Sequence, residues 1–226
     1  MNIKYSKQKQ EMRDDPVLDT LFKAKTFLMH NVNTFFGIGI VIVFAVGFFF
    51  FYDRMHESTL SKSEEAFGKA MIEYTNRNIE KAVEQFRIVA DNHRSTPQGI
   101  MSAHMLGSIF LSMGRYDDAI KWFEVASVAK KELGFVGGSA LEGLAGCYEA
   151  KGDIAKSLEY LEKALADDRV AYRHGAIRWK MALLYQKSGN LTRAIALCRE
   201  ILSDSTAADL QPKATNLIAA MEATSG

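Results

Sequence analysis

The stretch LGSIFLSMGRYDDAIKWFEVA, residues 106–126, decides the fold. Small and aromatic residues follow Gly107 at offsets of 3, 7, 9, 12, 16 and 19 positions: Phe110, Gly114, Tyr116, Ala119, Phe123 and Ala126. Small residues let two helix axes approach closely, and aromatic residues fill the space beside them. A glycine between the two halves can adopt the left-handed conformation that ends a helix. The stretch therefore predicts two antiparallel helices joined at Gly114.

The same pattern recurs along the second half of the chain. From Ala145 the offsets give Tyr148, Gly152, Ile154, Ser157, Leu161 and Ala164, and from Ala182 they give Tyr185, Gly189, Leu191, Ala194, Cys198 and Ile201. The anchor residues lie 38 and 37 positions apart. A weaker copy is anchored at Ala70, where the turn glycine is missing and Tyr74 is displaced by one position. A fixed period of this length indicates a solenoid of stacked helical pairs.

These positions resemble the tetratricopeptide repeat. The residues that define the repeat are Gly107, Gly114, Ala119, Ala145, Gly152, Ala182, Gly189 and Ala194. The resemblance implies an all-α solenoid over residues 63–226, with about three repeats and a capping helix from Pro212 to Thr224. Because the period exceeds the usual ~34 residues, we expect longer helices or loops, with Lys130–Ser139 as the longest loop.

Nearer the N-terminus, Thr34–Tyr52 is an uncharged run of 19 residues, TFFGIGIVIVFAVGFFFFY. At about 1.5 Å per residue it spans the ~30 Å hydrocarbon core of a bilayer. We therefore predict a transmembrane helix at residues 33–52. A buried core helix and a cleaved signal peptide are the alternatives. No small-residue cleavage site follows the run, which disfavours the second.

Lysine and arginine asymmetry predicts the orientation of this span. Residues 1–32 contain six such cations, and residues 53–68 contain two. The positive-inside rule then places the N-terminus in the cytoplasm and the C-terminal domain in the periplasm of a bacterial inner membrane. We expect residues 1–32 to form a cytoplasmic tail with an amphipathic helix that begins at Asp15–Pro16, or alternatively to extend the spanning helix inward. Residues 53–62 are the predicted juxtamembrane linker.

Composition and motifs exclude several classes of function. The 28 Lys and Arg residues balance 27 Asp and Glu residues, so the basic surface of a nucleic-acid binder is missing. The sequence contains no HExxH, P-loop or GxSxG motif. Cys147 and Cys198 occupy core positions of the repeat and are predicted as buried thiols, with a disulfide as the alternative. We therefore predict no enzyme, no cofactor, no metal site and no small-molecule substrate.

The repeat register predicts which side chains line the inner face of the solenoid. These candidate partner-binding residues are Phe67, Met71, Met101, His104, Leu111, Glu142, Trp179 and Leu183. Most are apolar, which suits an amphipathic helix or an extended apolar peptide. Met101 and Leu183 could instead complete the packing between repeats. The Lys and Asn residues with which chaperone-docking repeats clamp a C-terminal carboxylate are missing.

The overall layout is similar to the ancillary subunit of the bacterial Sec translocon (YfgM-like proteins). The similarity rests on LFKAKTFLMHNVNTFFGIGIVIVF, residues 21–44, and on the repeats. It implies a non-enzymatic accessory subunit whose partners are the membrane, other membrane proteins or periplasmic polypeptides. Two alternatives remain. The first is a structural or assembly subunit of a respiratory, photosynthetic or envelope complex. The second is a periplasmic peptidoglycan or division coordinator, because the helix start at Thr96–Pro97 also resembles the repeats of that family.

Overall fold

The computed structural model describes residues 16–129 and 133–225, and these contain helices and no strand. The chain divides between Ser58 and Thr59 into two compact units, each described by itself. The predicted domain limits of 1–32, 33–52, 53–62 and 63–226 remain predictions. Lys4, Lys7, Lys9, Arg13 and Asp15, on which the predicted orientation and helix start partly depend, lie outside the described residues.

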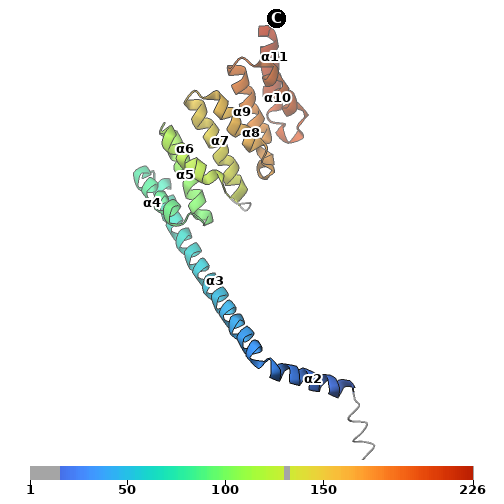
Figure 1. Ribbon diagram of the computed structural model, residues 1–226. Helices are drawn as coiled ribbons and strands as arrows, with labels where there is room; N and C mark the ends of the chain where they lie inside the picture. Colours follow the sequence, from blue (N-terminus) through green and yellow to red (C-terminus); the bar gives the residue numbers. More distant parts are fainter. Residues whose placement is uncertain (1–15, 130–132, 226) are drawn as a thin grey trace, which may run out of the picture. The chain divides into compact units, whose positions relative to one another are not determined.

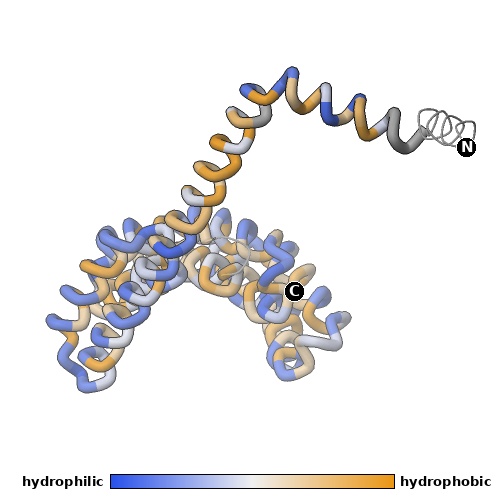
Figure 2. The backbone as a smooth tube through the Cα atoms, turned by 90° about the horizontal axis from the view of Figure 1, so that it is seen from below, coloured by the Kyte–Doolittle hydropathy of each residue, from blue (hydrophilic) through white to orange (hydrophobic). Residues whose placement is uncertain are grey.

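The first unit contains α2 (Pro16–His30) and most of α3 (Val32–Thr75). A single turn residue, Asn31, separates the two helices, so α2 is distinct from the long apolar helix. Among the described residues, α3 alone is long and apolar enough to cross a membrane, and its apolar window is not buried. Figure 2 shows this stretch of the helix mostly in orange, the colour of hydrophobic residues. Because α3 extends to Thr75, the predicted linker at 53–62 is helical.

The second unit is a stack of antiparallel helical pairs (Figure 1). After the end of α3 it contains α4 (Ile79–Asn92), α5 (Pro97–Ser112), α6 (Tyr116–Ser127), α7 (Gly134–Ala150), α8 (Ile154–Leu165), α9 (His174–Lys187), α10 (Leu191–Ser203) and α11 (Gln211–Ser225). The short 3₁₀ helices η2 (Asp168–Arg173) and η3 (Ser205–Ala207) precede α9 and α11. α11 is the capping helix that the sequence predicted. Phe67 and Tyr74 near the end of α3 pack against Phe86 of α4, so residues 59–75 form a first pair at the weaker copy of the repeat, beside the three clear pairs that the sequence predicted.

Left-handed residues end the first helix of every pair. Gly114, Gly152 and Gly189 have φ angles of 72°, 81° and 80°, which confirms the role predicted for them. In the first pair Arg77 takes the same place with a φ of 62°. The same two backbone hydrogen bonds close all four turns; in the first, Arg77 N–H donates to the Tyr74 carbonyl and Asn78 N–H to the Glu73 carbonyl. The turn geometry is therefore retained where the glycine signature is absent.

Replacing Arg77 by glycine should stabilise the second unit. A side chain at positive φ costs about 1–2 kcal/mol, which glycine would relieve. The greater conformational entropy of glycine in the unfolded chain offsets part of this stabilisation. We expect the free energy of unfolding to rise by about 0.5–1 kcal/mol, measured by urea denaturation of the full chain. Arg87→Gly, inside helix α4, is the matched control and should be destabilising by about 1 kcal/mol. Loss of stability in Arg77→Gly would show that the side chain makes a stabilising contact that outweighs the strain.

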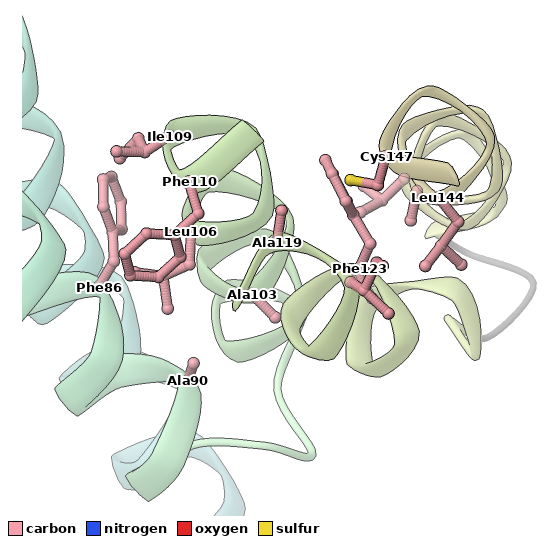
Figure 3. Close-up of a cluster of buried hydrophobic side chains, with 14 of the residues drawn as sticks. Phe86, Ala90, Ala103, Leu106, Ile109, Phe110, Ala119, Phe123, Leu144 and Cys147 are labelled. Carbon is pink, nitrogen blue, oxygen red and sulfur yellow. The ribbon is translucent and has the colours of Figure 1, made fainter. Parts of the chain in front are cut away.

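Buried side chains form two clusters along the solenoid. In the first, Phe86 faces Phe110 and Leu106 across the gap between α4 and α5 (Figure 3). The second is built mainly from α8, α9, α10 and α11. Cys147 and Cys198 are buried free thiols, as the core-position prediction required, and burial raises the pKa of Cys147 to about 11. The alternative of a disulfide between them is wrong.

The predicted long loop at Lys130–Ser139 is wrong over most of its length. Residues 130–132 lie outside the described part of the chain, but α7 already begins at Gly134. The glycines there serve close packing instead of a loop. A Cβ on Gly134 would lie 2.5 Å from the Arg169 side chain, and one on Gly138 would lie 2.4 Å from Val170. They allow η2 to pack against the first turns of α7.

Candidate binding groove

An apolar pocket of about 250 Å³ opens between the first helices of the first three pairs. Its walls come from the end of α3, from α5 and from α7: Phe67, Met71, Met101, His104, Met105, Phe135, Val136 and Ser139. The sequence register predicted four of these residues for the inner face. The structure adds Met105, Phe135, Val136 and Ser139, and Phe135 is half exposed at the start of α7.

A second, more polar hollow of about 410 Å³ adjoins the first and shares His104 and Ser139 with it. Leu111 and Ser108 from α5, Gly143 and Gly146 from α7, and Phe123 from α6 form part of its wall. Its charged residues are Glu142, Arg173 and Lys180. We call the two adjoining hollows together the inner groove.

Glu142 is held by two cations at the polar end of the inner groove. Arg173 donates from Nε and Nη2 to the two carboxylate oxygens at 2.5 and 3.1 Å, and Lys180 Nζ donates to Oε2 at 2.6 Å. Burial alone would raise the pKa of the Glu142 carboxyl, but these hydrogen bonds outweigh it and the pKa lies below its usual value. The network joins α7 to η2 and α9, across neighbouring repeats.

His104 lies where the two hollows meet, and its ring stacks edge-on against Phe123 with centroids 5.7 Å apart. Burial lowers the pKa of His104, which favours the neutral imidazole. The formal charge of the inner groove is therefore confined to the end formed by Glu142, Arg173 and Lys180.

The structure separates the eight predicted inner-face residues into two groups. Phe67, Met71, Met101, His104, Leu111 and Glu142 line the inner groove. Trp179 packs partly buried against the second core cluster, and Leu183 is exposed on α9; neither lines the groove. The sequence reasoning also missed Arg173 and Lys180. The available signal was Glu142 itself, a carboxylate at a buried repeat position that requires cationic partners.

Replacing Glu142 by glutamine should weaken the second unit and change its acid response. The variant leaves Arg173 and Lys180 without their carboxylate; because both cations reach solvent, we expect a loss of only about 1–2 kcal/mol at pH 7. The folded pKa of Glu142 is below the unfolded value, so its stabilisation is complete above about pH 4.5 and disappears as pH falls through the folded pKa.

Thermal unfolding of the full chain between pH 7 and pH 3 tests this pair of expectations. The difference in melting temperature between wild type and Glu142→Gln should shrink towards pH 3. Glu159→Gln is the matched control, since its exposed pair with Lys163 lies within one helix and contributes little. A constant difference across the pH range would contradict a stabilising role for the ionised carboxylate.

In the part of the chain that the structure covers, no group of three or more His, Cys, Asp or Glu side chains is arranged to hold a metal ion. The groove contains apolar side chains, small residues and one paired carboxylate. This arrangement can hold a side chain of another molecule by apolar contact and by charge.

Stacked antiparallel helix pairs with a hollow on the face of the first helices define a helical-repeat scaffold, a class that presents extended binding surfaces. The chain belongs to the tetratricopeptide repeat family, whose profile matches residues 67–131 and 148–212. No curated protein sequence matches the chain.

Solved structures share the fold at low sequence identity. MamA aligns with a TM-score of 0.56 and 17% identity over 70% of this chain and 84% of its own. PilF of Pseudomonas aeruginosa aligns with a TM-score of 0.50 and 19% identity over 70% of this chain and 72% of its own. Identities this low establish the likeness of fold alone.

Proposed function

We propose that this protein is a membrane-anchored, non-enzymatic module that binds a polypeptide in the inner groove. Tetratricopeptide repeat proteins generally mediate interactions between proteins. The single observation that carries the proposal is the groove itself: three methionines and two phenylalanines surround a pocket that is open to solvent. Methionine is flexible and polarisable, so such a wall adapts to apolar side chains of different shapes.

Substituting Met101 by glutamine tests the groove directly. The full chain in lipid nanodiscs would first select binders from a phage-displayed random dodecamer library. Because Met101 contributes apolar surface to the wall of the pocket, we expect Met101→Gln to weaken the binding of the selected peptides about tenfold. Met113→Gln is the control, since Met113 is exposed at the end of α5 and lines neither hollow. Equal affinities for both variants would remove the groove assignment.

The proposed anchor is the apolar part of α3, with the N-terminus in the cytoplasm of a bacterium and the second unit in the periplasm. The length and composition of α3 and the excess of cations before it support this arrangement. The native thiols are buried, so introduced cysteines can report the topology. An impermeant maleimide should label Ser205→Cys in intact spheroplasts, and Ser6→Cys only after lysis. The reverse pattern, or a chain that is soluble without detergent, contradicts the anchor.

The finer role that we propose is an accessory subunit of the Sec translocon or of its chaperone network. The similarity of layout and of residues 21–44 to YfgM-like proteins supports it. Affinity purification of the full chain in mild detergent should recover Sec components. Recovery of a different stoichiometric complex would favour a structural or assembly subunit of respiratory, photosynthetic or envelope machinery, and recovery of division proteins would favour a peptidoglycan coordinator.

A further inference from the structure

The charges of the inner groove are arranged with the anion hidden and the cations accessible. The Glu142 side chain is 4% exposed, whereas those of Arg173 and Lys180 are 36% and 49% exposed. One carboxylate faces two cations, so the cluster keeps an excess charge of +1. The part of this cluster that an incoming molecule meets is therefore positive.

The apolar pocket at the other end of the inner groove is small and has no charged lining residue. Its lining side chains are apolar except for His104 and Ser139. Its volume of about 250 Å³ lies below the ~300–1,000 Å³ that is typical of sites for small-molecule ligands. The size fits apolar side chains of a larger partner better than it fits a complete small molecule.

The two ends form one continuous surface. His104 from α5 and Ser139 from α7 belong to both hollows, and no charged side chain lines the junction at pH 7. A bound chain that places an apolar side chain among the methionines would thus direct its neighbouring residues towards Arg173 and Lys180.

We propose that the inner groove takes a polypeptide segment in which a bulky apolar side chain lies within a few residues of an aspartate or glutamate. The apolar side chain enters the pocket between Met71, Met101 and Met105. The carboxylate meets the exposed sides of Arg173 and Lys180. This inference rests on the proposed function, since it specifies the chemistry of the partner at the same groove.

A coupling experiment on selected peptides tests the charged end. From the dodecamers that bind the full chain in nanodiscs, the tightest one is synthesised together with its Asp→Asn or Glu→Gln isosteres. Wild-type protein should bind one isostere about tenfold more weakly than the parent peptide, and this difference in affinity should shrink as the salt concentration rises. With Lys180→Gln the peptide and its isostere should bind alike. Lys213→Gln, at an exposed position of α11, is the control and should keep the tenfold difference.

Lys180→Arg shows whether the effect of Lys180→Gln comes from the lost charge or from altered packing. Because arginine keeps the positive charge, this variant should again bind the acidic peptide more tightly than its amide isostere. Two outcomes overturn the inference: selected peptides that show no preference for acidic residues, or an isostere penalty that persists in Lys180→Gln. In both cases Met101→Gln still weakens binding. If Met101→Gln has no effect, the proposed function itself fails, so the two failures are distinguishable.

Discussion

Replacing Phe123 by alanine is expected to lower the free energy of unfolding of the second unit by about 3–5 kcal/mol. Phe123 lies on α6 with 2% of its surface exposed. A Cβ on Gly107 would come within 2.7 Å of its ring, and one on Gly143 within 2.5 Å. The ring thus fills the space between α5 and α7 so closely that only glycine fits opposite it on both helices.

The loss should be large because the cavity cannot easily close. Gly107 and Gly143 have no side chains that could move into the space, and the helices are held by their other contacts. Urea denaturation of the full chain, followed by far-ultraviolet circular dichroism, measures the effect. Phe135→Ala is the matched control, since Phe135 is 50% exposed and its removal should cost little stability. Equal losses for both variants would contradict the packing at Phe123.

Gly99→Ala should destabilise the second unit by about 3 kcal/mol, the upper part of the range for overpacking. Gly99 lies in the first turn of α5, where the Thr96 hydroxyl caps its backbone N–H at 3.1 Å. An added Cβ would lie 2.0 Å from the His93 carbonyl oxygen. Because the obstacle is backbone and not a flexible side chain, the α4–α5 turn would have to move.

Gly68→Ala provides a control of opposite sign. Gly68 lies inside α3, and a Cβ there would meet nothing within 4 Å. Alanine is the better helix former, so this variant should gain roughly 0.5–1 kcal/mol. Melting temperatures of the full chain should therefore move in opposite directions for the two variants. A melting temperature of Gly99→Ala equal to that of wild type would contradict the close approach of α5 to His93.

The sequence predicted the repeats where their signature is explicit. Gly114, Gly152 and Gly189 marked three turns correctly, because few other residues adopt positive φ without strain. The first pair was uncertain for the same reason: its left-handed turn position holds Arg77 where the other pairs have glycine. The glycines near residue 134 were wrongly predicted to form a loop. They lie in a helix and leave room for Arg169 and Val170, which are about 35 residues away in the sequence.

The groove was predictable only in part. The register identified residues that face inward, including Met101 and Glu142. It could not predict that Arg173, which belongs to a short 3₁₀ helix outside the repeat pattern, pairs with Glu142. Nor could it separate Trp179, which packs into the second cluster, from side chains that remain accessible. Periodicity specifies a direction on a helix, whereas accessibility depends on how neighbouring pairs stack.

Photo-crosslinking with a selected peptide tests the binding role of the inner groove most directly. A photoreactive amino acid would replace Met105 in the groove, or Val125 on the exposed side of α6, in the full chain in nanodiscs. Binding in the inner groove predicts a crosslinked peptide from position 105 and none from position 125. A crosslink from position 125 with none from position 105 would contradict it.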